Sequence, residues 1–137
     1  MEVQEIMCTD VAVLTPRSSL RDAAELMHDR DVRHIPILDG GQVVGIVSDR
    51  DVRCYLTDLF RGEPETIPAQ SRKSTPLREV MQSKPVAVDP SADVGEVIDL
   101  LLDFKIGAVV VSDSEGRLQG IVSYEDVLKA VRDEFIV

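Results

Sequence analysis

The chain has 137 residues, a length that suits one compact domain or two small lobes sharing a core. Apolar residues make up 44% of it and aromatic residues only 4%, so aliphatic side chains must fill that core. The formal net charge of −10 repels phosphate backbones, which argues against general nucleic-acid or anionic-membrane binding. No apolar stretch is long enough to span a bilayer.

Nothing in the sequence indicates secretion or catalysis. The first ten residues carry acids and lack an apolar signal core. The two cysteines, Cys8 and Cys54, fit neither a disulfide framework nor a zinc site, and we interpret them as reduced thiols of a cytoplasmic protein. No acid–base pair, nucleophile arrangement or metal-ligand spacing stands out, so we predict no catalytic residue, no metal and no enzyme.

The first half of the chain begins with an apolar turn over residues 3–7 and a short strand over 11–14. Ser19 is a candidate helix N-cap, and Asp22 three residues later completes a capping pair. A helix to about Asp31 should follow, because apolar residues recur at the spacing of one buried helix face: Leu20, Ala23, Ala24 and Met27.

A hairpin and a second helix complete this half. Residues 34–38 and 43–47 read as strands joined by the glycine-rich turn 39–42. A helix follows Ser48, with Val52, Tyr55, Leu56 and Leu59 on its apolar side. Residues 61–76 lose the periodicity and are rich in proline, which is typical of a linker.

The same order then starts again. Residues 77–81 match the opening turn, 86–88 the first strand, and Asp93 with Glu96 the capping pair. The hairpin strands recur at 107–111 and 118–122, and Ser123 opens the last helix. The sequence therefore predicts an α/β (α+β) protein with two β-α-β-β-α repeats, at 1–60 and 77–137, and a linker at 61–76.

Paired motifs occur at matching places in the two repeats: Leu14-Thr15-Pro16 and Val88-Asp89-Pro90, Val32-Arg33-His34-Ile35-Pro36-Ile37 and Ile106-Gly107-Ala108-Val109-Val110-Val111, and Gly-x-x-Ser-x-x-Asp ending at Asp51 and Asp126. In these motifs the chain resembles the CBS-domain family, specifically the tandem pair called a Bateman module, over almost its whole length. The family often has proline at the position of Val110, a departure that concerns the shape of one pocket.

The resemblance implies two pseudo-twofold clefts between the repeats, either of which binds an adenine nucleotide. The aspartate of one repeat would hold the ribose, and two strands of the other repeat would hold the base. The primary cleft would then use Val11, Ala12, Arg33, His34, Ile35, Arg50, Ser123 and Asp126. The secondary cleft would use Pro85, Val86, Ala108, Val109, Ser48 and Asp51.

The two Ser-x-x-Asp segments allow two readings. A carboxylate can accept hydrogen bonds from both ribose hydroxyls, and a helix N-terminus offers donors to a phosphate. The same spacing is also that of a helix capping pair, and the two roles can coexist. Gly45 and Gly120 interrupt strands, for which we prefer a structural role to a ligand contact.

The positive charges are unequal between the repeats. Arg33, His34 and Arg50 in the first repeat correspond to Gly107, Ala108 and Glu125 in the second, which carry no positive charge. The primary cleft should therefore prefer phosphorylated ligands, with His34 charged mainly below about pH 6.5. A solvated surface is the alternative for each of these side chains. Tyr124 could stack on a ligand or cover the hairpin.

The function that the resemblance implies is a non-enzymatic, energy-sensing regulatory module. Its ligand would be AMP, ADP, ATP or S-adenosylmethionine, and its regulated partner protein is not specified by the sequence. The alternative is a protein-interaction module whose clefts are empty or structural. Family modules pair through helices, so we expect a homodimer to which residues 52–60 and 127–135 contribute.

Overall fold

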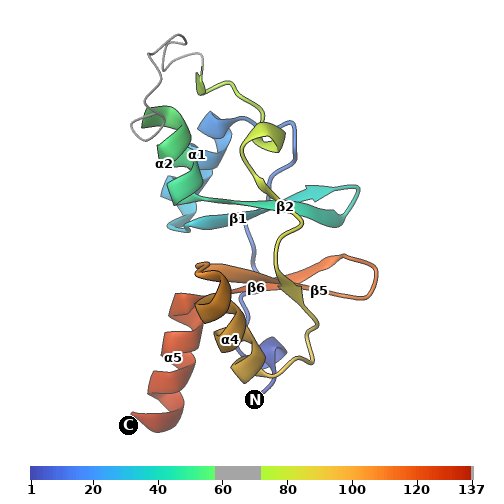
Figure 1. Ribbon diagram of the computed structural model, residues 1–137, viewed down its shortest axis with the longest axis vertical. Helices are drawn as coiled ribbons and strands as arrows, with labels where there is room; N and C mark the ends of the chain where they lie inside the picture. Colours follow the sequence, from blue (N-terminus) through green and yellow to red (C-terminus); the bar gives the residue numbers. More distant parts are fainter. Residues whose placement is uncertain (58–71, 137) are drawn as a thin grey trace. The chain divides into compact units, whose positions relative to one another are not determined.

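The computed structural model describes residues 1–57 and 72–136, so most of the predicted linker 61–76, and residues 58–60 of the second helix, lie outside the described residues. The chain forms two compact units, each built from separate stretches of sequence. Unit 1 comprises Met1–Val11, Gly41–Val43 and Pro85–Val137, and unit 2 comprises Ala12–Gly40 and Val44–Lys84. Each contains a mixed layer of helices and strands, which confirms the predicted α+β class (Figure 1).

Unit 2 holds a three-stranded sheet in the order β1-β2-β3 with helices packed on it. Its elements are α1 (Leu20–Arg30), β1 (His34–Asp39), β2 (Gln42–Ser48), α2 (Asp49–Thr57), η2 (Leu77–Glu79) and β3 (Gln82–Ser83). The predicted strand at 11–14 pairs only at Leu14, which forms a parallel bridge to Ile37. The Leu14 N–H donates to the Pro36 carbonyl, and the Leu14 carbonyl accepts from the Leu38 N–H. This pairing requires no N–H from residue 36, so a proline is tolerated there.

The helix signals of the first repeat are realised as predicted. Ser19 caps α1: its hydroxyl accepts from the Asp22 N–H at 3.1 Å, and the Asp22 carboxylate accepts from the Ser19 N–H at 2.9 Å. The helix ends at Asp31, which adopts the left-handed conformation. Gly40 and Gly41 form the two-residue hairpin turn with φ of 60° and 83°, a conformation that explains the two glycines.

Unit 1 holds the second sheet, in the order β4-β5-β6. Its elements are η1 (Val3–Glu5), β4 (Ala87–Val88), α4 (Val94–Phe104), β5 (Ala108–Ser112), β6 (Leu118–Ser123) and α5 (Tyr124–Phe135). Strand β4 runs parallel to β5, and β5 is antiparallel to β6. Asp93 is the N-cap of α4 as predicted, but its carboxylate accepts from the Gly95 N–H at 3.1 Å, so it does not pair with Glu96 as Ser19 pairs with Asp22.

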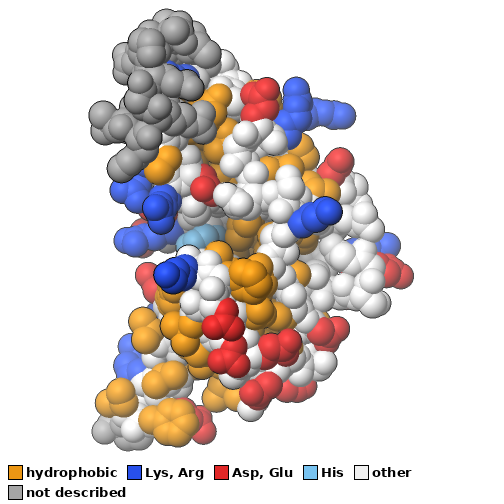
Figure 2. Space-filling model, in the orientation of Figure 1, with side chains coloured by type: hydrophobic (Ala, Val, Ile, Leu, Met, Phe, Trp, Pro, Cys, Tyr) orange, Lys and Arg blue, Asp and Glu red, His pale blue; other side chains and the backbone are white. Residues whose placement is uncertain are grey.

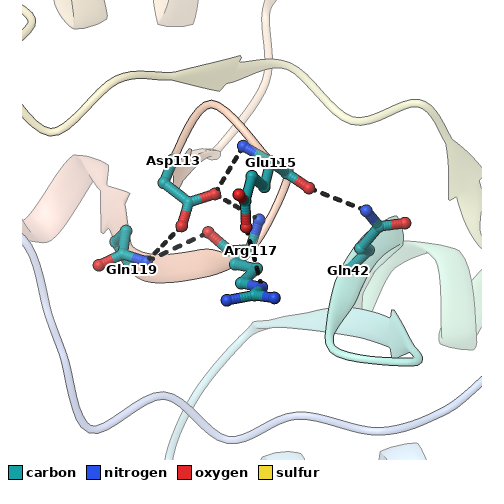
Figure 3. A network of polar contacts seen from close by, with 5 residues as sticks. All are labelled: Gln42, Asp113, Glu115, Arg117 and Gln119. Carbon is teal, nitrogen blue, oxygen red and sulfur yellow. Dashed lines mark hydrogen bonds and ion pairs between the residues drawn. The ribbon is translucent and has the colours of Figure 1, made fainter.

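The longer second hairpin loop is held by one carboxylate. Asp113 accepts from the backbone N–H groups of Glu115 and Arg117, each at 2.9 Å (Figure 3). Gln42, which belongs to unit 1, donates from its side-chain amide to the Glu115 carbonyl at 2.9 Å. Gly116 closes the turn with a φ of 80°. These bonds explain how the extra residue of this loop is accommodated.

The two cores show that the repeats exchange their opening turns. The core of unit 1 is formed by valines and Leu101, and it includes Val3 from the beginning of the chain, which is fully buried. The core of unit 2 includes Leu77, from the turn that opens the second repeat in sequence. The sequence repeats and the compact units are therefore different divisions of the chain, and the boundaries 1–60 and 77–137 stay a prediction for the repeats.

Two glycines make this exchange possible. A Cβ on Gly120 would lie 2.8 Å from the Cys8 carbonyl oxygen and 2.8 Å from the Met7 sulfur. A Cβ on Gly45 would lie 2.5 Å from the Met81 sulfur. Each opening turn thus lays its methionine over the glycine of the hairpin that it joins, which gives both glycines the structural role preferred from the sequence.

Candidate functional site

The first Ser-x-x-Asp segment lies where β2 ends and α2 begins. The Ser48 N–H donates to Oδ2 of Asp51 at 3.0 Å, and the Asp51 N–H donates to the Ser48 hydroxyl at 3.1 Å. Both residues are half-buried. The capping role is therefore present, and it fixes the carboxylate at the first turn of the helix.

The second segment, where β6 leads into α5, repeats this geometry. Oδ2 of Asp126 accepts from the Ser123 N–H at 2.9 Å and from the Ser123 hydroxyl at 3.1 Å. Within the described residues, Oδ1 of Asp126 and Oδ1 of Asp51 accept no hydrogen bond. Each carboxylate thus uses one oxygen for the cap and has a second oxygen available as an acceptor.

The backbone before each helix is also the same in both repeats. The Asp49 N–H donates to the Arg33 carbonyl at 2.9 Å, and the Tyr124 N–H donates to the Gly107 carbonyl at 3.2 Å. Each bond holds the start of a hairpin strand beside the first turn of the following helix. Arg33, His34 and Ser48 are thereby grouped within unit 2.

The charges of this group differ from those of its counterpart. Arg33 and Arg50 are exposed, and neither forms an ion pair with another residue in the described ranges. The counterparts in unit 1 are half-buried Gly107, buried Ala108 and exposed Glu125. The inequality of charge predicted from the sequence therefore applies to groups with the same backbone geometry.

His34 is half-buried at the start of β1. Burial lowers its pKa below the ordinary 6.5, although the carboxylates of Asp49 and Asp51 act to raise it and Arg33 lowers it further. The imidazole is consequently neutral at pH 7. A positive potential in this group at that pH comes from the two arginines.

The predicted base-contacting residues fall into two classes. Ile35 and Val109 are fully buried and belong to the hydrophobic cores of unit 2 and unit 1, so their side chains pack in the core. Ala12 and Ala108 are also buried, at 8% and 6% exposed. The remaining four are half-buried: Val11, His34, Pro85 and Val86.

The predicted site residues are divided between the two units. Of the primary set, Ala12, Arg33, His34, Ile35 and Arg50 belong to unit 2, and Val11, Ser123 and Asp126 to unit 1. Of the secondary set, Ser48 and Asp51 belong to unit 2, and Pro85, Val86, Ala108 and Val109 to unit 1. In unit 2 the structure places Arg33, just before β1, beside the N-terminus of α2, and in unit 1 it places Gly107, just before β5, beside the N-terminus of α5.

Asp49 is a residue of this group that the sequence analysis did not identify. It influences the pKa of His34, and it forms an ion pair with Arg53 at 3.6 Å. The sequence signal was weak, because an acid at the first position of a helix is common on dipole grounds alone.

The described residues offer no metal site and no membrane span. In residues 1–57 and 72–136, no three side chains of His, Cys, Asp or Glu are grouped as metal ligands would be. Among the helices of the same ranges, none combines the length and the hydropathy needed to cross a bilayer.

Two relatives match most of this chain. The chain is 33% identical over 134 residues to a 33.4 kDa protein of Thermofilum pendens, covering 93% of this chain and 43% of that relative. It is 26% identical over 137 residues to an inosine-5'-monophosphate dehydrogenase of Korarchaeum cryptofilum, of which it covers 26%. The chain thus spans less than half of the length of these two relatives.

Two solved structures have the same fold. The CBS domain pair of protein MJ0100, solved with 5'-methylthioadenosine and S-adenosyl-L-methionine, aligns at a TM-score of 0.82 and 24% identity over 98% of each chain. CBSX2 of Arabidopsis thaliana, solved in complex with AMP, aligns at 0.81 and 26% identity over 96% of each chain. The sequence model of the CBS-domain family matches residues 3–58 and 77–133, which are two tandem CBS repeats. This chain therefore belongs to the CBS-domain family.

Proposed function

We propose that this chain is a non-enzymatic regulatory module that binds an adenine nucleotide or a related adenosyl ligand. One observation carries the proposal: the same junction between a strand and a helix occurs in both repeats. At each junction the serine that ends the strand holds the carboxylate of Asp51 or Asp126 through one oxygen, and the second oxygen remains available as an acceptor. A ribose diol is a suitable partner for such an oxygen, because it supplies two hydroxyl donors. The AMP complex of CBSX2, at 26% identity, supports the adenosyl class.

The residues proposed for the primary site come from both repeats. Asp126 would accept from the ribose, and Arg33 and Arg50 would face the phosphate. The secondary site would use Asp51 for the ribose, and Glu125 would oppose a phosphate there. AMP, ADP, ATP and S-adenosylmethionine are all within the proposed class, and the assembly of each site from the two units is part of the proposal.

Calorimetric titration with adenosine, AMP, ADP, ATP and S-adenosylmethionine tests this function. Asp126→Ala should abolish binding at the primary site while lowering the free energy of unfolding by only about 0.5–2 kcal/mol, the usual effect of losing a cap. Asp22→Ala is the matched control, since Asp22 forms the same capping pair with Ser19 but belongs to neither proposed site. It should lose similar stability and keep its affinity.

Equal affinity in the Asp126→Ala variant and the parent would contradict the ribose role. A parent that binds none of the five ligands would instead favour a protein-interaction module. Apolar side chains exposed on α5 are the observation that supports this second function. In either case the regulated partner would be a separate protein or a domain of a longer chain.

A further inference from the structure

The net charge of the chain is not shared between its two units. Unit 2 contains equal numbers of basic residues (Lys and Arg) and acidic residues (Asp and Glu), so the whole net charge of −10 is carried by unit 1. Figure 2 shows acidic side chains gathered over the elements of unit 1, and Lys and Arg side chains beside α2 of unit 2. A ligand that binds against unit 1 therefore meets a more negative potential than one that binds against unit 2.

The secondary site depends mainly on the acidic unit. Its proposed base-contacting residues all belong to unit 1, and only Ser48 and Asp51 come from unit 2. The bond from the Tyr124 N–H to the Gly107 carbonyl, at 3.2 Å, holds the first turn of α5 beside the start of β5. Under the proposed function, Glu125 in that turn lies toward the 5' substituent of the bound adenosine. The charge that this substituent meets is therefore set by unit 1.

The charge of Glu125 is not compensated by its neighbours. Its carboxylate is exposed and forms no ion pair with another residue in the described ranges, including Lys129 one turn further along α5. Lys105 is also exposed, but it ends α4, where a positive charge complements the dipole of that helix. The N-terminus of α5 supplies about half a positive charge, which the carboxylates of Glu125 and Asp126 in its first turn outweigh. This end of the secondary site is therefore negative.

The equivalent group of unit 2 has the opposite balance. Arg33 and Arg50 stand at the positions that Gly107 and Glu125 take in unit 1. Asp49 lies in the same turn as Arg50, but its carboxylate is already paired with an arginine one turn further along α2, at 3.6 Å. The same backbone geometry thus presents a positive group in unit 2 and a negative group in unit 1.

The two charges suit different 5' substituents. A phosphate monoester carries about −1.5 to −2 charges at pH 7, so a carboxylate beside it lowers its affinity. S-adenosylmethionine instead carries a positive sulfonium on the 5' carbon and an ammonium group further along the same substituent. A carboxylate attracts both groups and can accept hydrogen bonds from the ammonium. Tyr124, which is 45% exposed next to Glu125, adds an aromatic side chain of the kind that favours cations.

We propose that the secondary site selects adenosyl ligands with a cationic 5' substituent, and that Glu125 determines this specificity. The primary site, with Arg33 and Arg50, would then be the one for phosphorylated ligands. This inference rests on the proposed function, which leaves the ligand of each site open within the adenosyl class. It divides that class between the two sites according to the charge of the ligand.

Calorimetry of the full chain carrying Asp126→Ala isolates the secondary site. S-adenosylmethionine and S-adenosylhomocysteine are the probes, since they differ by the methyl group that makes the sulfur positive. The first should bind about five- to tenfold more tightly, a range between an exposed ion pair and a charge-assisted hydrogen bond. Glu125→Gln in the same background should remove this difference. Glu134→Gln, which removes an exposed charge near the other end of α5, is the matched control and should keep it.

AMP gives the converse measurement. In the Asp126→Ala background it should bind more weakly than adenosine, and Glu125→Gln should narrow that gap. Equal affinities for the two sulfur ligands, or a preference that survives Glu125→Gln, would overturn the inference and leave the proposed function standing, because adenosyl ligands still bind. Loss of all binding in the Asp126→Ala protein alone would also overturn only the inference. A parent that binds no adenosyl ligand would instead refute the proposed function, and the inference with it.

Discussion

Replacing Gly120 by alanine should destabilise unit 1 because the new methyl group has no space. Its Cβ would lie 2.8 Å from the Cys8 carbonyl oxygen, and that oxygen accepts from the Ile121 N–H at 3.0 Å. Forcing a methyl group into such a site costs about 1–3 kcal/mol, and the reduced entropy of the unfolded chain returns about 0.4–1 kcal/mol. If the two backbone bonds between Cys8 and Ile121 are also lost, the loss grows by about 1–3 kcal/mol.

Urea denaturation of Gly120→Ala should therefore show a loss of up to about 3 kcal/mol if the two backbone bonds survive, and of roughly 1–6 kcal/mol if they are lost. Gly45→Ala should lose less, because the nearest atom is the flexible Met81 side chain and the nearest backbone atom, the Gln82 oxygen, is 3.1 Å away. Gly95→Ala is the control: it lies in α4, meets only the Asp93 side chain at 2.9 Å, and gains helix propensity. If Gly120→Ala is as stable as Gly95→Ala, residues 7 and 8 do not pack over β6 as described.

Two further predictions concern charge. Arg50→Ala should weaken the binding of AMP about ten- to a hundredfold, more at low than at high salt, and should change the binding of adenosine little. Arg53→Ala, which changes an exposed arginine of the same helix, is the control and should leave the affinity for AMP unchanged. An equal effect of the two variants would contradict the phosphate role of Arg50. Because burial lowers the pKa of His34 in the folded protein, the unfolded chain binds its proton more tightly, so the free energy of unfolding should fall as pH drops below 6.5. Denaturation of His34→Gln between pH 7.5 and 5 should show a shallower fall than the parent, and a slope equal to the parent's would contradict this; His28→Gln, which changes an exposed histidine, is the control.

The periodic signals of the sequence predicted the local structure well, because each depends on neighbours within one helical turn or one hairpin. The cap at Ser19, the glycine turn at 40–41 and the repeat offset are of this kind. The family follows from the paired Gly-x-x-Ser-x-x-Asp segments, because each occurs at the same junction of its repeat.

The exchange of opening turns could not be predicted in the same way. Val3 and Leu77 have the same apolar pattern and would fit either core, so the choice depends on packing between distant segments. The sequence also could not show whether Ile35 and Val109 are core residues or line a ligand pocket, because strand residues in both places are apolar. For the site, the sequence supplied the residue types, and the structure added that each aspartate retains an oxygen beyond its cap.

The exchanged turns also have a consequence for the order in which the chain can fold. Every segment of unit 2 lies before residue 85, so this unit can form while the ribosome is still adding the second repeat. Unit 1 joins Cys8 to Ile121, roughly a hundred positions apart, and closing so long a loop is entropically costly. The first residues of the chain, although synthesised first, must wait for residues 90–94, which pair with residues 1–4, and for β6, which pairs with Cys8. During that interval Val3 and Met7 have no core to join, because the residues that form the core of unit 1 around them lie in the second half of the chain.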